Sequence, residues 1–511
     1  MNPFWYRILF RKAGKPRKLT RAVLFRKDRT ARPLFYRVIH KKNGVVRPHW
    51  IYWAADSSPG LPVELPGAGV ERVETENLTP AEKVLRRLPR FDRMVADVRR
   101  DAPLPDLLSA ETIQSQLSAL PPGELLLVAS HDNYREVPGG VQLCIQHEEK
   151  AAQERGLNYL QFHPWQHLPA LAPEGDGSDL PVTLVLNGKM IGTTTMGTLT
   201  EAIASLVAAG QQVRLVVHHL LGHSPESITQ LARTAQVREV PFWLHDFFTL
   251  CPSYTLQRNN LAFCGAPPTE SNACQLCVYG QAREGHLQRI EALFKSLPIV
   301  AVSPSQVTAD FWKSKSKLPL AGFAVVPHVV LDTRPKALPD PVDQSAPITI
   351  GFLGGAVPHK GWPAFSEIMF RHSGTGRRFV VFSDKRPGLG EDEWHFVHVT
   401  TDEPDAMAQA VAKAKVDFVL HWASWPETFS FTTFEALTGG AWVLTNPVSG
   451  NVQATVQRTG YGAVLDDLAD LDRLFADEEL EKLAARRRAE SARTEITARQ
   501  SALSFDLPGW S

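Results

Sequence analysis

Two glutamates, Glu427 and Glu435, have seven residues between them in segment 425–451, and a Gly-Gly turn and the apolar run AWVLTN follow them. This pattern predicts a loop, a helix that Glu435 opens, and a strand. The backbone N–H groups of residues 430–433 would then lie at a helix N-terminus, which suits an anion such as a diphosphate. Each carboxylate can accept hydrogen bonds from vicinal hydroxyls, which a sugar and a ribose both offer. The alternative is that Glu435 is a first-turn acid that only stabilises its own helix.

A second pattern suited to phosphate lies in ITIGFLGGAVPHKGWPAF, residues 348–365. An apolar strand runs into Gly354-Gly355, and Lys360-Gly361 follows. A glycine turn lets the backbone approach a phosphate closely, and a lysine supplies a point charge. The alternative is a plain surface loop that carries a lysine.

Histidines and another glycine pair follow apolar runs in the first half of the chain. The run at 124–130 leads to Gly139-Gly140, and VVHHLLGHS places His218, His219 and His223 at the end of a predicted strand. FWLHDFF places His245 and Asp246 at the end of another strand. We expect His245 to orient a sugar hydroxyl and Asp246 to fix its tautomer; the alternative is a hydrogen-bonded core histidine.

Four of the five cysteines fall within one short segment, with the spacing C-x12-C-x9-C-x2-C. In a reducing compartment this spacing is typical of a tetrahedral thiolate site, most simply structural zinc. An iron–sulfur cluster, two disulfides and four unlinked thiols are the alternatives. The fifth, Cys144, falls in a helical pattern and is expected to pack in the core. The candidate zinc ligands are Cys251, Cys264, Cys274 and Cys277.

Composition excludes several classes of protein. The 511 residues are 43% apolar and 21% charged, with a net charge of +1, which is typical of a folded chain rather than a basic nucleic-acid binder or an acidic disordered one. No run of 18 apolar residues occurs, and the first residues lack the pattern of a secretory signal. Five cysteines do not make a disulfide scaffold. We therefore expect a cytoplasmic protein.

The first 50 residues carry 15 Lys and Arg against one acid, Asp28, and repeat with a period of 15. Phe10, Phe25 and His40 occupy equivalent positions, each followed by two basic residues. Such a segment can dock on anionic lipid headgroups or an acidic partner, where each base contributes on the order of 1 kcal/mol. A solubilising or oligomerising arm is the second interpretation, and nucleic acid is the least favoured.

The chain divides into blocks that alternate strands with helices after residue 122. Apolar strands separated by helices predict parallel sheets covered on both faces, so we expect an α/β fold with two doubly wound domains and ligands in the cleft between them. The predicted blocks are basic repeats at 1–53, a linker and helical region at 54–121, a first domain at 122–331 with a cysteine-rich insertion at 247–280, a proline-rich linker at 332–347, a second domain at 348–490, and a tail at 491–511.

Segment 425–451, with its E-x7-E pattern followed by EAL, small residues and a strand, resembles the donor half of retaining GT-B glycosyltransferases of family four. The resemblance covers residues 122–505 and implies two Rossmann-like domains facing a cleft, preceded here by a basic extension. It implies that Glu427 contacts the transferred sugar and that Glu435 holds the ribose. The backbone at Phe431 and Thr432 would meet the diphosphate, and Lys360 would bind phosphate beside the Gly354-Gly355 loop.

The resemblance also assigns roles in the first domain. The Gly139-Gly140 loop would face the donor, and the pair His245-Asp246 would lie by the acceptor and the reacting carbon. The cysteine-rich insertion resembles one in related bacterial transferases, and the tail would return to the first domain. The family usually has a basic residue a few positions after the loop glycine. Here Ala356, Val357 and Pro358 stand there, and the candidate substitutes are His359, Lys385 and Arg386.

The expected activity is transfer of a sugar from a UDP-, GDP- or ADP-linked donor to a hydroxyl of a glycan or glycolipid, with retention of anomeric configuration. The family suggests bacterial surface polysaccharide biosynthesis, with no cofactor required for catalysis and a structural zinc as the one metal. Residues 1–50 would attach the protein to the inner face of a membrane. The alternative is a non-catalytic GT-B-like binding protein that uses its basic arm for a membrane or polyanion.

Overall fold

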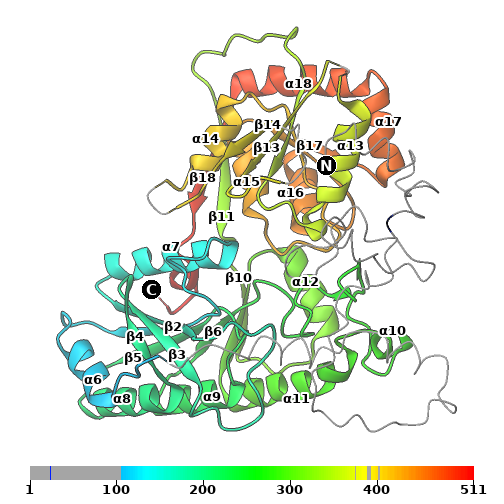
Figure 1. Cartoon of the computed structure of the whole chain (residues 1–511). Coiled ribbons are helices and arrows are strands. Elements are labelled where there is room, and N and C mark those ends of the chain that lie inside the picture. The colour runs from blue at the N-terminus through cyan, green and yellow to red at the C-terminus, as the bar shows by residue number, and fades with distance from the viewer. Residues whose placement is uncertain (1–23, 25–104, 375, 388–392, 401–402, 511) are drawn as a thin grey trace, which may run out of the picture. The chain divides into compact units, whose positions relative to one another are not determined.

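The computed structural model describes residues 24, 105–374, 376–387, 393–400 and 403–510 (Figure 1). The predictions for the basic repeats and for most of the following linker therefore concern residues outside this part. All described residues from 105 onward belong to one unit of the chain. Its elements form two sheet-containing domains.

The first domain is built on an eight-stranded sheet in the order β10-β9-β6-β5-β1-β2-β3-β4. The pairs from β10 to β2 are parallel, whereas β2–β3 and β3–β4 are antiparallel. Its elements are α6 Ala110–Ser118, β1 Leu125–Ala129, α7 Gly140–Glu154, β2 Asn158–Pro164, β3 Pro181–Leu186, β4 Lys189–Thr195, α8 Met196–Ala208, β5 Val213–Val217, α9 Pro225–Thr234, β6 Val240–Trp243, β7 Gln257–Arg258, β8 Ala262–Phe263, α10 Asn272–Gln275, α11 Gly280–Ser296, β9 Ile299–Ser303, α12 Gln306–Lys315 and β10 Gly322–Val325.

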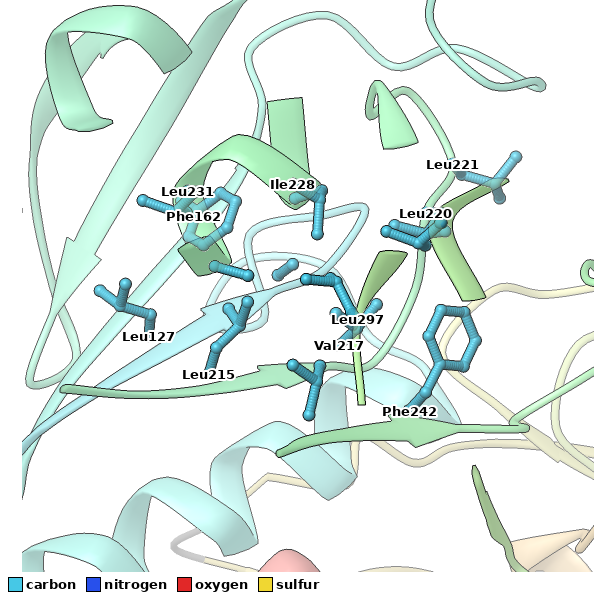
Figure 2. Packing of buried hydrophobic residues seen from close by; sticks show 14 of the residues in the cluster. Leu127, Phe162, Leu215, Val217, Leu220, Leu221, Ile228, Leu231, Phe242 and Leu297 are labelled. Atoms are coloured by element: carbon cyan, nitrogen blue, oxygen red, sulfur yellow. The ribbon is translucent and has the colours of Figure 1, made fainter. Parts of the chain in front are cut away.

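Helices cover both faces of this sheet, so its central strands are apolar on both sides. Alternate residues of one strand enter different cores: Leu127 packs under α8, α9 and α11, and Val128 packs under α7. Figure 2 shows Leu215 and Val217 of β5 directed toward Ile228 of α9. This double burial explains why the central strands appear in the sequence as unbroken apolar runs.

The antiparallel edge of the sheet differs from the parallel sheet that the sequence predicted. Strands β3 and β4 form a hairpin across Asn187-Gly188, whose φ angles are 44° and 79°. Positive φ at both central residues is the geometry that makes Asn-Gly a hairpin turn. Strands β2 and β4 were not predicted, because polar residues such as Gln161 and Thr193 interrupt their apolar pattern.

The second domain has six strands, all parallel, in the order β14-β13-β12-β15-β16-β17. Helices α13, α17 and α18 contribute to one core, and α14, α15 and α16 to the other. Its elements are β12 Thr349–Leu353, the 3-10 turn η4 Pro358–Lys360, α13 Trp362–His372, β13 Arg378–Ser383, β14 Glu393–Phe396, α14 Ala406–Lys413, β15 Phe418–Leu420, α15 Phe431–Thr438, β16 Trp442–Thr445, α16 Asn451–Thr459, β17 Gly462–Val464, α17 Leu468–Ala476 and α18 Glu479–Arg493.

Two strands outside both sheets, β11 Val329–Pro335 and β18 Thr494–Gln500, form an antiparallel pair. In the chain, β11 connects the first domain to the second, and β18 leads from the second domain to the tail. The segment expected to be a linker from residue 332 thus begins inside a strand. After β18, the turn η5 Leu503–Asp506 packs against α7, and Trp243 Nε1 donates to Ser504 Oγ at 3.0 Å. The last described residues therefore complete the core of the first domain.

A cavity of about 640 Å³ is lined by both domains, including Val325 and Pro327 of the first and Phe434 and Arg458 of the second. Two sheet-containing domains, each with parallel central strands covered by helices on both faces, confirm the predicted α/β class. Among the described helices, none combines the length and apolar character that crossing a membrane requires.

Candidate functional site

The predicted donor loop leads into α15, which begins at Phe431. Ser430 precedes the helix with a φ of 72°, a left-handed conformation that is uncommon for a residue other than glycine and recurs at functional sites. Thr433 N–H donates to Ser430 O at 3.1 Å, so Phe431 and Thr432 carry the N–H groups that remain for a diphosphate. Glu435 lies in the second turn of α15 and does not open it, which corrects the sequence-based placement.

Glu427 is held rigidly before this helix. Its backbone pairs with Gly450, and Asn451 N–H donates to Glu427 O at 2.9 Å. The buried carboxylate accepts from Trp425 Nε1 at 3.0 Å. Burial alone would raise its pKa, but His421, Lys360 and His359 together hold the pKa of Glu427 below its ordinary value. Glu427 is therefore an ionised acceptor at neutral pH.

His421 lies beside Glu427 at the end of β15. Its Nε2 is 3.9 Å from Glu427 Oε1, which is too long for a hydrogen bond, and this buried nitrogen has no partner among the described residues. A buried polar atom without a partner costs stability unless a ligand satisfies it. The pair thus leaves a place for a ligand hydroxyl.

Glu435 and Lys360 approach the same place from α15 and η4. Burial raises the pKa of Glu435 to about 7, with Asp405 adding to the rise and the charge of Lys360 opposing it. The charge of Lys360 also acts on Glu427. The charge of one lysine therefore acts on both glutamates.

The two predicted glycine loops meet the first turn of α15. A Cβ on Gly140 would lie 3.4 Å from the Phe431 ring, and a Cβ on Gly354 would lie 3.6 Å from Thr432 Cγ2. Gly139 precedes α7 directly, and Gly355 is exposed in the loop after β12. The structure thus brings one glycine loop from each domain to the proposed diphosphate site.

Contacts from the first domain fix the donor loop. Thr428 O accepts hydrogen bonds from Ser305 Oγ at 2.8 Å and from Thr308 Oγ1 at 3.2 Å. Thr428 Oγ1 in turn donates to the backbone oxygen of His245. These bonds place His245 directly beside the loop that carries Glu427.

The expected partnership between His245 and Asp246 is absent. Asp246 Oδ2 pairs with His219 Nε2 at 2.8 Å, and its Oδ1 accepts from Phe248 N–H at 2.8 Å. His245 Nε2 instead meets His218 Nδ1 at 2.8 Å. The two adjacent side chains thus have different partners, His218 and His219, both of which follow β5.

Several functional candidates carried no sequence signal. Glu148 lies within the helical pattern of α7, where a buried acid looks like any surface glutamate. His328 follows β10 and stacks on Phe431 with ring centroids 5.6 Å apart. His421 directly follows β15, and an apolar strand followed by His-Trp could have drawn notice to it. His223, by contrast, donates from Nε2 to Ser130 O at 2.6 Å and is a buried core histidine.

His359 is the nearest of the candidate substitutes for the basic residue missing at 356–358. Its ring lies 6.3 Å from that of Trp425, and burial with the neighbouring charges of Glu427 and Lys360 leaves its pKa below the ordinary value. Lys385 and Arg386 are exposed beyond β13. The charges of both Glu427 and Lys360 therefore act on His359, and burial favours its neutral form.

The four clustered cysteines line one cavity of about 20 Å³, enough for a single small occupant. All four are free thiols, and Arg283 Nη1 donates to Cys274 Sγ at 2.8 Å. No three of these sulfur atoms lie within 4.8 Å of one another. The donor chemistry and the size of the cavity fit zinc, and the sulfur atoms would have to draw inward to bind it.

No model of a known protein family matches this chain, and no curated protein does. The chain is similar to several solved structures. Anabaena HepE in complex with UDP-glucose is 12% identical, with 72% of this chain and 93% of that chain covered and a TM-score of 0.43. WaaG, a glycosyltransferase involved in lipopolysaccharide biosynthesis, is 15% identical over 72% of this chain and 95% of that chain, with a TM-score of 0.40.

The catalytic domain of starch synthase IV from Arabidopsis thaliana, bound to ADP and acarbose, is 12% identical, with 72% and 96% of the two chains covered and a TM-score of 0.40. At these identities and scores, the function of this chain has to be argued from the residues of its own site.

Proposed function

We propose that this protein is a glycosyltransferase that moves a sugar from a nucleotide-sugar donor to a hydroxyl acceptor with retention of anomeric configuration. One observation carries the proposal: a glycine loop from each domain meets the first turn of α15, where Glu427, Lys360 and Glu435 converge. This combination offers backbone N–H groups, a cation and two carboxylates in one place. The N–H groups and the cation suit the diphosphate of a nucleotide sugar, and the carboxylates suit the hydroxyls of its ribose and its sugar.

In this proposal the diphosphate binds the N–H groups of Phe431 and Thr432 and the ammonium of Lys360. Glu435 accepts hydrogen bonds from the ribose, and Glu427 accepts them from the transferred sugar. A sugar hydroxyl would also satisfy the unpartnered Nε2 of His421. The helix N-terminus and the lysine stabilise the charge that develops on the leaving phosphate.

The reaction breaks the bond between the anomeric carbon and the phosphate oxygen and forms one from that carbon to the acceptor oxygen. Retention follows if the acceptor enters from the face that the diphosphate leaves, with the acceptor proton passing to the leaving phosphate oxygen. Each step balances without a further reactant. His245, beside the donor loop, is placed to orient a hydroxyl at the reacting carbon.

The proposed substrates are a nucleotide sugar and a carbohydrate acceptor. The donor is a UDP-, GDP- or ADP-sugar, and the acceptor is a glycan or glycolipid of a bacterial surface polysaccharide. The enzyme would act in the cytoplasm, attached to the inner membrane face through residues 1–50, which lie outside the described part of the chain except for Leu24.

A donor panel with one variant tests this function. Nucleotide release from UDP-, GDP- and ADP-sugars should depend on an added acceptor, and Glu427→Gln should lower it on the order of 10²–10³-fold. Glutamine keeps an oxygen for Trp425 Nε1, so the fold should survive. Glu367→Gln on exposed α13 is the matched control and should keep full activity.

Full turnover in Glu427→Gln would refute the site. No release from any donor, together with tight binding to anionic vesicles or polyanions, would favour the non-catalytic binding protein instead.

We further propose that the four clustered cysteines hold a structural zinc ion. Thiolates around a small cavity suit zinc, and Arg283 would offset part of the negative charge that zinc leaves on four thiolates. Elemental analysis should find about one zinc per chain, and Cys274→Ser should lower both zinc content and melting temperature. A metal-free protein of full stability would contradict the proposal.

A further inference from the structure

Three side chains form a hydrogen-bonded line that ends in the candidate site. Glu148 Oε2 of α7 lies 2.9 Å from His218 Nε2, and His218 Nδ1 lies 2.8 Å from His245 Nε2. Glu148 and His218 are both fully buried, whereas His245 is partly exposed. We call these residues the Glu148–His218–His245 triad.

Packing holds the rings of the triad in register. His218 and His245 stack with centroids 5.1 Å apart and an interplanar angle of 14°. Trp243 stacks on both rings, at 6.0 Å and 5.5 Å, and its own Nε1 is bonded to Ser504. A rotated imidazole would break this stack, so the two nitrogens of each ring keep distinct roles.

Every group that meets the Glu148 carboxylate donates to it. Tyr159 O–H donates at 3.1 Å and Ser504 N–H at 3.4 Å, in addition to His218. Burial would raise the pKa of Glu148, but His218 and these two donors lower it below the ordinary value. An ionised carboxylate can only accept, so the proton of neutral His218 resides on Nε2.

This polarity passes along the triad. With its Nε2 protonated, His218 offers a lone pair on Nδ1, which accepts from His245 Nε2–H. Nδ1 of His245 is then the unprotonated nitrogen and the one left for a ligand. If His218 were protonated, its Nδ1–H would donate to His245 Nε2. The proton of neutral His245 would then lie on Nδ1, and Nδ1 would be a donor.

Burial favours the neutral form of three titratable neighbours of His245, namely His131, His328 and Cys144. His131 and His328 have pKa values lowered to about 3, chiefly by burial, and burial raises the pKa of the Cys144 thiol. His219 is bonded to Asp246. Burial, with His218, His328, His219 and His131 adding, holds the pKa of His245 itself well below the ordinary value.

We infer that Glu148 and His218 are positioning residues that set the tautomer of His245, so that its Nδ1 accepts a hydrogen bond from a substrate hydroxyl. The inference rests on the proposed function for the identity of that hydroxyl. It assigns to Glu148 the task that the sequence analysis gave to Asp246. It also links the tail to the site, because Ser504 holds the far oxygen of Glu148.

The test is nitrogen NMR of histidine-labelled full-length protein, with the His245 signal assigned by its loss in His245→Asn. In the wild type above neutral pH, Nδ1 of His245 should be unprotonated and Nε2 protonated. Glu148→Gln should shift this equilibrium, because an amide can donate to His218 as well as accept. Glu149→Gln is the matched control: it removes the neighbouring buried carboxylate of the same helix, which pairs with Arg135 outside the triad.

Kinetics supply the second readout. Acceptor-dependent kcat should fall on the order of 10²-fold in Glu148→Gln, while the donor KM should stay within roughly twofold. An unchanged His245 tautomer in a folded Glu148→Gln, or a protonated Nδ1 in the wild type, overturns the inference, and the wild-type measurement stands even if the variant does not fold. A tautomer shift without transfer from any donor would refute the proposed function but not the triad.

Discussion

Glu427 and Glu435 have the same side chain, and their surroundings push their pKa values in opposite directions. Histidines and Lys360 surround Glu427 and keep it ionised, whereas burial raises the pKa of Glu435 to about 7. Titratable groups that are separated in this way mark sites with distinct tasks. Glu427 is thus a constant anion, and Glu435 is close to half-protonated at neutral pH until a bound ligand changes its surroundings.

The raised pKa of Glu435 predicts a pH dependence of stability. Between pH 4.5 and about 7 the folded protein holds a proton that the unfolded chain has lost, so the free energy of unfolding falls as pH rises through this window. The total contribution is about 3 kcal/mol. The glutamine in Glu435→Gln is neutral at every pH, so this part of the pH dependence of the free energy of unfolding should be absent.

The measurement compares the melting temperatures of wild type and Glu435→Gln from pH 5 to 8 without nucleotide. The melting temperature of Glu435→Gln should rise relative to that of the wild type as pH rises. The melting temperature of Glu367→Gln should change with pH as that of the wild type does. A constant difference between Glu435→Gln and wild type would show that Glu435 does not titrate in this range.

At the scale of elements, the turn η4 and the loop after β15 pack backbone to backbone. Gly361 ends η4 with a φ of 91°, and a Cβ there would lie 2.4 Å from Trp422 O. Ser424 N–H also donates to His359 O at 3.0 Å. The position of Lys360 relative to Glu427 therefore depends on one residue without a side chain.

Gly361→Ala should lower the free energy of unfolding by more than the strain of a left-handed alanine alone. The added Cβ would also clash with backbone atoms of Trp422, which cannot move aside. Gly460→Ala is the control: its φ is 71°, and nothing lies within 4 Å of the added Cβ. The control should cost about 1–2 kcal/mol, and Gly361→Ala should exceed it and also weaken nucleotide binding. Equal urea midpoints for the two variants would mean that η4 and the Trp422 loop can separate.

At the scale of the whole described unit, each domain supplies part of the other's site. Ser305 and Thr308 of the first domain fix the donor loop of the second, and Gln257 Nε2 donates to Ser424 Oγ at 2.7 Å. The tail returns from α18 through β18 to pack on α7. It buries Leu503, Phe505, Leu507 and Trp510 in the core that also holds Trp243.

The tail is therefore expected to be structural. Phe505→Ala should destabilise the protein by about 3–5 kcal/mol, since the ring is buried and lies 4.9 Å from the Arg155 guanidinium. Pro508→Ala, at an exposed position of the same tail, should change stability by less than about 0.5 kcal/mol. Thermal unfolding of both variants decides this; an unchanged melting temperature in Phe505→Ala would show that the tail detaches readily.

The predictions from sequence succeeded where local pattern carries the information. Apolar runs predicted the central strands of both sheets because both faces of a parallel sheet are buried, and the loop before α15 was predicted from its glutamates and the small residues that follow. The antiparallel edge was missed because β2 and β4 mix polar and apolar residues. The start of α15 was predicted one turn too late, at Glu435 instead of Phe431. The left-handed Ser430 precedes the helix, and helix propensities give no signal for such a residue.

By itself, the sequence determined the two-domain α/β class, the glycine loops, and the residue types that can grip a diphosphate and a sugar. Only the tertiary structure decided which side chains are partners. Asp246 pairs with His219 and not with His245. Glu148, which is 70 positions before His218 in the chain, contacts His218 and has the positioning role that was expected of Asp246. Hydrogen bonding depends on direction and distance in space, and residues far apart in sequence meet only when strands and helices have packed into a common core.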